Sequence, residues 1–427
     1  MTVASRFVTW FTGRQTRSDD DEHHRSVCSA VPGWASKWGE SGLAYLTGPP
    51  AGPPDFSRAN VLARAEHVAA AVGQRLGIAV DASALLAGRA GLLGLTRGGR
   101  VSAGGATRLL PARDGWCAIT LSRPDDVAAV PALLQSDEVP IDPWPALGQW
   151  AARCPVSVVT ERAALLDIPA AGLGEVAAAS PQARHLGFRS DPRGLAGLLV
   201  ADLSSMWAGP LCGQLLARAG ATVVKVESRR RPDGTRTGNR EFFDWMNSKK
   251  LSYAIDFEAD AEELRELLSV ADIVIEGSRP AALERRGLGP HDVAPRPGRI
   301  WLRVNGYEQP RPAFGDEAAV AGGLVGAADG AGLKGPVFCG DAIADPLTGL
   351  EATVAVLESL SRGGGELIHV SMAAVAATYA ALPTEPSAAP YPAPPPRPPA
   401  ACAPAAELGA DNDAVRRMVS ERRCPSC

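Results

Sequence analysis

The chain has 427 residues, of which 46% are hydrophobic and 21% are charged, and its formal net charge is −4. This length predicts two or three domains with ample core, and the composition is ordinary for a soluble globular protein. The small negative charge gives no broad electrostatic reason to expect nucleic acid as a partner. Eight cysteines are too few to predict a disulfide scaffold in a chain of this length.

The sequence indicates neither secretion nor insertion into a membrane. Arginines interrupt the apolar residues near the N-terminus, and no apolar run reaches the length of a membrane span. We therefore expect a cytoplasmic protein with no membrane partner. His23 and His24 have no partner at a useful spacing, and the terminal CPSC is a single CxxC, so no metal site is predicted.

The first half of the chain predicts three regions in order. A charged run indicates a mobile N-terminal segment over residues 1–35. Residues 36–99 are expected to be helical, because apolar side chains recur at helical spacing in two stretches. Residues 100–190 predict a small α+β domain, in which a hairpin precedes several short helices. The two long helices are expected at 57–76 and 82–95, the hairpin at 107–121, and the short helices from 123, 145 and 156.

From Gly197 apolar strands alternate with helices, which predicts a Rossmann-like, doubly wound parallel sheet. The strands are expected at 198–203, 222–227, 251–256, 273–276 and 300–304, and the helices at 210–219, 260–270 and 280–286. Neither GxGxxG nor GxxxxGK[ST] occurs, so the loops fit neither a dinucleotide site nor a P-loop. Basic residues at the carboxyl ends of the strands favour an anionic ligand there. They are Arg229, Arg230, Arg231, Arg236, Lys249, Lys250, Arg279, Arg285 and Arg286.

The stretch from Gly335 to Met372 combines a Gly/Asp-rich loop, an apolar-periodic helix, a triple glycine and a strand over Leu367–Ser371. Two acids, Asp341 and Asp345, precede the helix. An aspartate at this place is often only a helix cap. The N-terminus of a helix also stabilises negative charge, so a chemical role for one of these acids is the alternative.

Several motifs in the second half resemble the class III CoA-transferases, the CaiB/BaiF family, in order and spacing. They are VADLSSMWAGPLCGQLLARAGATVVKVES, DGTR, FFDWMNSKKLSYAIDF, ADIVIEGSRPAALERRGLG, RIWLRVNGY, and DPLTG followed by GGGELIHVSM. The resemblance implies a large CoA-binding catalytic domain over 195–380. It also implies an acyl-CoA:carboxylate CoA-transferase acting through an aspartyl anhydride and an aspartyl-CoA thioester. Asp345 matches the family nucleophile, and Asp341 is the second candidate and expected support.

The resemblance also implies where CoA binds and what the protein acts on. Met206 and Trp207 lie where the family lines its nucleotide site, and Ser228 and Arg229 follow the second strand. Arg279 and Arg285 match family arginines, and Arg236 lies in the basic edge. The expected partners are an acyl-CoA and a carboxylic acid, with no permanently bound cofactor. Ordinary members form interlocked dimers, so a homodimer is implied.

The domain order departs from that of the family, since the small-domain motifs precede the large domain here. Residues 36–99 resemble part of a second copy, and residues 381–427 predict a Pro/Ala-rich tail with a short terminal helix. One alternative is an α-methylacyl-CoA racemase, but its histidine position reads Phe314-Gly315-Asp316-Glu317. A non-catalytic CoA-binding partner is the other alternative, because Gly277-Ser278 departs from the family motif.

Overall fold

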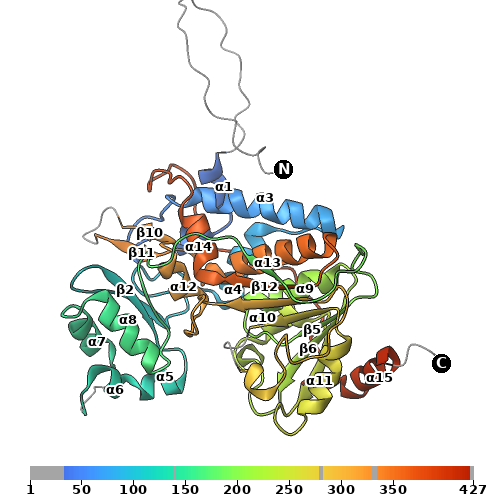
Figure 1. The fold of residues 1–427 in the computed structure, drawn as a ribbon. Coiled ribbons are helices and arrows are strands. Elements are labelled where there is room, and N and C mark those ends of the chain that lie inside the picture. The colour runs from blue at the N-terminus through green and yellow to red at the C-terminus, as the bar shows by residue number, and fades with distance from the viewer. Residues whose placement is uncertain (1–32, 138–140, 278–281, 329–333, 424–427) are drawn as a thin grey trace, which may run out of the picture. The chain divides into compact units, whose positions relative to one another are not determined.

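A seven-stranded sheet organises the second half of the chain in this computed structural model (Figure 1), which describes residues 33–137, 141–277, 282–328 and 334–423. The strand order is β4-β12-β9-β8-β5-β6-β7. Neighbouring strands pair in parallel except β4, which pairs antiparallel with β12. The α/β class with a parallel sheet is therefore confirmed. The strands are β4 Gln182–His185, β5 Leu199–Asp202, β6 Thr222–Ser228, β7 Leu251–Ile255, β8 Ile273–Glu276, β9 Ile300–Asn305 and β12 Glu366–Ser371.

Helices cover both faces of this sheet, because alternate strand residues point to opposite sides. Val200 of β5 packs into one core cluster with α9 (Ala208–Arg218) and α13 (Ala344–Ser361). Its neighbours Leu199 and Ala201 pack into a second cluster with α11 (Ala261–Val270) and α15 (Asn412–Arg423). All four residues of β5 are buried, as expected for a central parallel strand.

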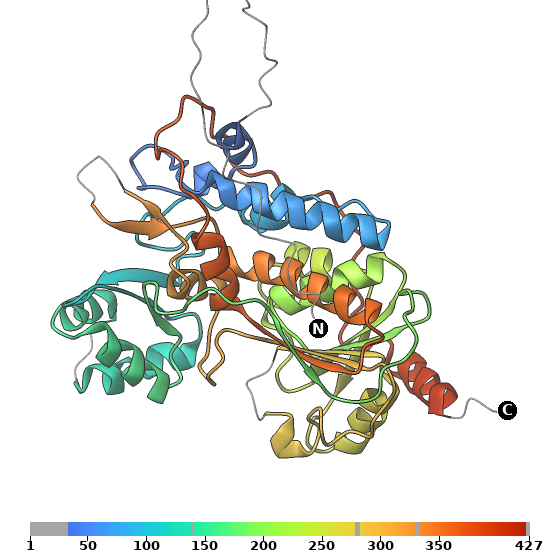
Figure 2. The same cartoon turned by 45° about the horizontal axis from the view of Figure 1, so that its top comes forward.

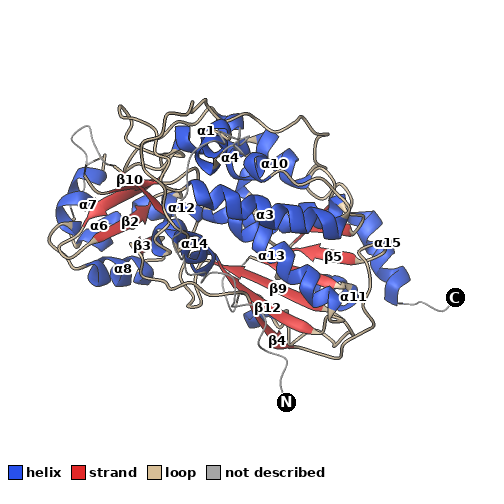
Figure 3. Ribbon diagram, turned by 90° about the horizontal axis from the view of Figure 1, so that it is seen from above, coloured by secondary structure: helices blue, strands red, loops and turns tan. Residues whose placement is uncertain are grey.

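The N-terminal helices pack on the large sheet's helical layer. They are α1 (Trp34–Glu40), α2 (Leu43–Leu46), α3 (Ala59–Leu76) and α4 (Ala82–Leu93). The buried face of α3 repeats at helical spacing from Val61 to Val72 and belongs to the same core cluster as α13. Figures 2 and 3 show α3 running alongside α13 above the strands.

The small α+β region contains the antiparallel sheet β1-β2-β3 with its own core. The predicted hairpin is confirmed, with Thr107 opposite Thr120 and Pro111 opposite Trp116. Its elements are β1 (Thr107–Pro111), β2 (Trp116–Thr120), β3 (Ala170–Gly172), α5 (Pro124–Ala128), α6 (Val130–Leu134), α7 (Trp144–Ala151) and α8 (Val156–Leu165). Between β9 and β12 lie α12 (Gly315–Ala321) and the hairpin β10 (Val325–Ala327) and β11 (Pro336–Phe338), and α14 (Met372–Ala380) follows β12.

The helix expected over 280–286 is wrong in its described part, which holds a single turn of 3-10 helix at Glu284–Arg286. Residues 1–32 of the predicted N-terminal segment and residues 278–281 lie outside the described residues. The helix α10 (Arg240–Asn247), the edge strand β4, and the helices α12 and α14 were not predicted. Among the described residues, none of the helices combines the length and apolar character needed to cross a membrane.

Candidate active site

The loop before α13 places two aspartates at the end of the large sheet. The helix begins at Ala344 with Ile343 as its N-cap, so Asp345 lies in the first turn and is not the cap. Gly340 and Ala342 both adopt left-handed backbone conformations, with φ of 68° and 43°. A positive φ is unusual for alanine and stores strain, which surrounding contacts must hold in place.

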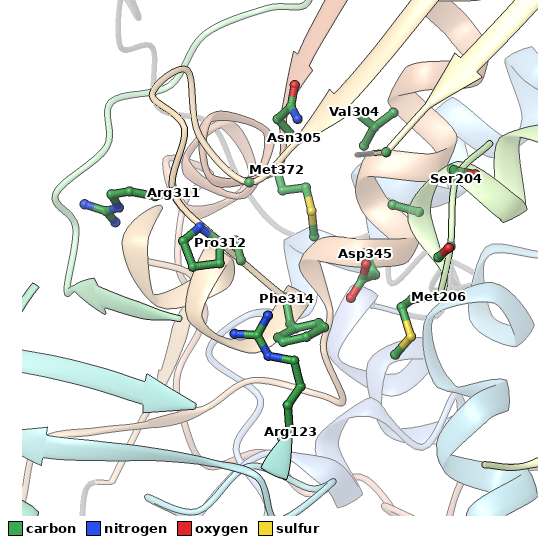
Figure 4. A pocket seen from close by; sticks show the side chains of 16 residues that line it. Arg123, Ser204, Met206, Val304, Asn305, Arg311, Pro312, Phe314, Asp345 and Met372 are labelled. Atoms are coloured by element: carbon green, nitrogen blue, oxygen red, sulfur yellow. The ribbon is translucent and has the colours of Figure 1, made fainter. Parts of the chain in front are cut away.

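Asp345 faces a cavity of about 210 Å³ (Figure 4). The cavity lies between the start of α13, the loop that follows β5, the loop that follows β9, and Arg123 of the small α+β region. In Figure 4 the Asp345 carboxylate points into this space beside Met206, while Phe314 and Arg123 face it. The polar or charged lining residues are Arg123, Ser204, Ser205, Asn305, Arg311 and Asp345; the others are apolar or glycine.

Asp345 is half-buried, and this burial raises its pKa to about 7. Arg89 counteracts the rise, Asp316 adds to it, the backbone N–H of Ala208 counteracts it, and Asp341 adds to it. A carboxyl with this pKa exists near neutral pH as a mixture of its protonated and ionised forms. Its ionised form is poorly solvated, which suits a nucleophile or a base.

Gly315 leaves the space that the Asp345 carboxylate occupies. A Cβ atom at residue 315 would lie 2.2 Å from Asp345 Oδ2 and 2.4 Å from the carbonyl oxygen of Ala342. Both distances are far below van der Waals contact, so only glycine fits here without moving the loop or the carboxylate.

Three carboxyls gather around one arginine behind the cavity. Arg89 Nη1 lies 2.6 Å from Oδ1 of Asp341, whose side chain is 1% exposed. Burial raises the pKa of Asp341, and Arg89 acts in the opposite direction. Asp316 accepts a hydrogen bond from the N–H of Ala342 at 3.0 Å, and burial together with Asp341 raises its pKa to about 6. The sequence indicated Asp341 but missed Arg89, because nothing local links two residues that are so far apart in the chain.

Glu317 connects this cluster to the small α+β region. It is fully buried, and burial raises its pKa to about 8. Its Oε2 accepts from Thr120 Oγ1 at 2.7 Å, and Thr120 Oγ1 lies 2.9 Å from Thr107 Oγ1. Thr107 in turn donates to Asp316 at 3.4 Å. The hairpin pair Thr107 and Thr120 thus bridges the two neighbouring acids of α12.

A buried ionic network holds the loop that follows β5. Lys250 Nζ lies 2.8 Å from Asp202, and Lys225 Nζ lies 2.8 Å from Asp233. Asp233 also accepts from the N–H of Met206 at 3.1 Å. Met206 has a φ of 72° and is 39% exposed, so the network presents its side chain to the cavity in a strained backbone conformation. The lysine expected in the basic edge at position 250 is therefore a buried structural residue.

The structure brings only some of the predicted site residues together. Met206 and Asp345 line the cavity, and Asp341 lies behind it. Trp207 does not line it, because its ring is 2% exposed and packs edge-on against Phe242 at 5.3 Å. Arg279 lies outside the described residues.

The remaining predicted residues lie elsewhere. Arg236 binds Glu227 through both Nε and Nη2 and stacks on Phe243, so its guanidinium serves the packing at the end of β6. Ser228 ends β6 without lining the cavity, and Arg229 donates from Nε to the carbonyl oxygen of Ala254. Arg285 is exposed on the 3-10 turn.

Comparison with known proteins finds relatives of part of the chain. The sequence model described as CoA-transferase family III matches residues 195–400. A succinyl-CoA–D-citramalate CoA-transferase of Chloroflexus aurantiacus is 32% identical over 42% of this chain and 50% of its own length. A formyl-CoA:oxalate CoA-transferase of Escherichia coli is 30% identical over 42% of this chain and 47% of its own length. The chain thus spans about half the length of the curated relatives it matches.

Two solved structures are also similar to part of the chain. One is a CAIB/BAIF family protein from Brucella suis, with a TM-score of 0.40 and 28% identity over 45% of this chain and 56% of that one. The other is the hypothetical protein Rv3272 from Mycobacterium tuberculosis, with a TM-score of 0.40 and 29% identity over 44% of this chain and 57% of that one. The family match includes Asp316, Asp341 and Asp345, whereas Arg89 precedes it.

Proposed function

Because residues 195–400 match the sequence model of CoA-transferase family III, we propose that this protein moves CoA from an acyl-CoA to a carboxylic acid, with Asp345 as the nucleophile. One observation carries the assignment of the residue. Asp345 is a half-buried carboxyl at the start of α13 that opens onto a cavity and has a pKa near neutrality. Desolvation makes such a carboxylate a stronger nucleophile than one in water.

The proposed reaction needs no group beyond the two substrates. The ionised carboxylate of Asp345 attacks the thioester carbonyl, the C–S bond breaks, and CoA leaves as a thiolate from the resulting mixed anhydride. The thiolate attacks Cγ of Asp345 and releases the donor acid, which leaves an aspartyl-CoA thioester. The acceptor carboxylate attacks Cγ, and the thiolate leaves and attacks the new anhydride. The products are the second acyl-CoA and free Asp345.

The surroundings of Asp345 support this chemistry. The N–H of Ala208 is directed at its carboxylate from the start of α9 and stabilises negative charge there. Apolar side chains such as Phe314 and Met372 limit the water at the cavity wall. An anhydride survives long enough to be attacked by a thiolate only where water is scarce. The expected acyl-CoA, carboxylic acid and homodimer remain part of this proposal.

Trapping the covalent intermediate tests the proposal. Full-length protein is mixed with succinyl-CoA, chosen because one relative is named for that donor, and is quenched with hydroxylamine or borohydride. We expect mass spectrometry to find a hydroxamate or a reduced side chain at Asp345. Asp345→Asn should abolish the modification, whereas Asp413→Asn, on an exposed turn of α15, should leave it unchanged. Modification of Asp341 instead would contradict the assignment.

One observation favours the racemase as a second candidate. Asp316 and Asp345 both have raised pKa values, and Asp316 adds to the rise at Asp345. Two such carboxyls could exchange a proton with the α-carbon of an acyl-CoA. Loss of α-deuterium from a 2-methylacyl-CoA without an adduct at Asp345 would establish it. Binding of CoA with neither reaction would point to the non-catalytic partner.

A further inference from the structure

Arg89 reaches the candidate site from a part of the chain that the family match does not include. It lies on α4, within the helical region that precedes the small α+β region. Its guanidinium contacts Asp341 and lies 5.6 Å from the ring centres of both Trp207 and Phe242. A planar cation held by one carboxylate and two aromatic rings is fixed in position more firmly than a surface arginine.

We propose that Arg89 is the positioning residue for Asp345, so that α4 completes the active site from outside the family-matched segment. The side chain of Asp341 is the first link between Arg89 and Asp345. Its Oδ1 is paired with Arg89, and its Oδ2 has no hydrogen-bond partner among the described residues. Without Arg89 the carboxyl would be buried with no cation, which is strongly unfavourable unless it is protonated or moves.

The backbone of the loop is the second link, from Asp341 to Asp345. The left-handed Gly340 and Ala342 flank Asp341, and Ala342 donates its N–H to Asp316. Two interactions therefore hold a strained turn at the start of α13. They are the ion pair at Asp341 and the hydrogen bond at Ala342. If Arg89 is removed, the ion pair is lost, and the backbone strain favours a movement of the turn. Because this turn positions Asp345, the Asp345 carboxyl would move as well.

The charges that face Asp345 explain why one arginine matters. Asp316 of α12 and Asp341 of the preceding loop oppose its ionisation, while the N–H of Ala208 at the start of α9 favours it. Arg123 and Arg311 line the same cavity, but Arg123 is paired with Asp126 and Arg311 with Glu175. Arg89 favours the ionised form of Asp345 and also lowers the pKa of Asp316 and Asp341.

The role of Arg89 in catalysis rests on the proposed function, but its effect on the ionisation of Asp345 can be measured without substrate turnover. Full-length protein is labelled with isotope at aspartate Cγ, and the Asp345 resonance is assigned by its loss in Asp345→Asn. Its chemical shift is followed against pH. In Arg89→Met we expect the midpoint of the Asp345 titration to rise by about one pH unit or more, because a nearby cation is lost.

A second variant gives a shift of opposite sign. Asp341→Asn removes a negative charge and frees Arg89 to face Asp345, so the midpoint of Asp345 should fall by about one unit. General loosening of the loop would not move the two variants in opposite directions. The matched control is Arg75→Met, an exposed arginine on α3, which should leave the midpoint unchanged. Arg89→Lys keeps the charge, so its Asp345 midpoint should stay close to that of the original protein.

The Asp345 titration in either variant, Arg89→Met or Asp341→Asn, can overturn the inference. It fails if Arg89→Met leaves the midpoint where Arg75→Met does. If Arg89→Met does not fold, as judged by circular dichroism, the Asp341→Asn variant decides, and an unchanged or raised midpoint refutes the inference. Opposite shifts combined with no adduct from succinyl-CoA would instead refute the proposed function while leaving the hold of Arg89 on Asp345 intact.

Discussion

Asp345 is a nucleophile candidate because of what surrounds it and not because of its residue type alone. Burial and two neighbouring acids raise its pKa, and one arginine and one backbone N–H limit that rise. The balance leaves a carboxyl that is partly ionised near neutral pH and weakly solvated. Asp341, four residues earlier, is almost fully buried and paired with Arg89, so it suits a supporting role better than attack on a substrate.

The close approach of Gly315 to Asp345 leads to a prediction about adding a single methyl group at residue 315. Gly315→Ala would put its Cβ within 2.2 Å of Asp345 Oδ2, so the carboxylate must move. A misplacement of about 1 Å at a reacting group can cost on the order of a hundredfold in rate. We expect a loss of this size in transfer rate, with the fold retained by circular dichroism.

Gly148→Ala is the matched control for that experiment. Gly148 also lies in a helix, and a Cβ there meets nothing within 4 Å. Alanine favours helix over glycine, so this variant should be fully active and at least as stable as the original protein. Equal activity of the two alanine variants would show that the geometry at Asp345 tolerates the methyl group.

Among the elements, α15 and the turn before it protect the exposed edge of the large sheet. Strand β7 is the last strand of the sheet, so among the described residues one of its edges has no neighbouring strand. Asp411 accepts from the N–H of Ser252, and the Asn412 side chain both accepts from the N–H and donates to the carbonyl oxygen of Ala254. These side chains take the place of a further strand, which guards the edge against pairing with other chains.

Replacing Asn412 should therefore weaken the edge. Asn412→Ala removes both side-chain hydrogen bonds to Ala254, which we expect to lower the free energy of unfolding by about 1 to 3 kcal/mol. Denaturant unfolding of the full chain measures the change. Asp413→Ala, whose side chain is 84% exposed, serves as the control and should be close to neutral. Equal stability of both variants would mean that α15 contributes nothing through these bonds.

Elements with a strong local pattern were the ones that the sequence predicted. The apolar runs of β5, β6 and β8 and the periodic face of α3 were placed correctly within one or two residues. The short strand β4 was missed because all four of its residues are exposed and it forms only by pairing with β12. The α10 and α12 helices were missed for a similar reason, since their short sequences gain stability from packing that local propensity does not reveal.

At the scale of the whole molecule, the site draws on residues far apart in the chain. Asp345 and Met206 could be predicted from the resemblance of the second half to a known family. Arg89, Thr107 and Thr120 could not, because they come from regions that the family match does not cover. The N-terminal helices contribute core packing and a charged side chain to the half of the chain that the family model matches.

The central proposal, that Asp345 is attacked and restored in each transfer, predicts where an oxygen atom goes. The protein is incubated with succinyl-CoA and succinate carrying heavy oxygen in its carboxylates, and the peptide containing Asp345 is analysed by mass spectrometry. Attack of the labelled carboxylate on Cγ, followed by attack of CoA on the new anhydride, should leave one heavy oxygen on Asp345 after a single transfer and up to two after repeated transfers. Exchange of label between succinate and succinyl-CoA with no heavy oxygen on Asp345, or with the label on Asp341, would contradict it.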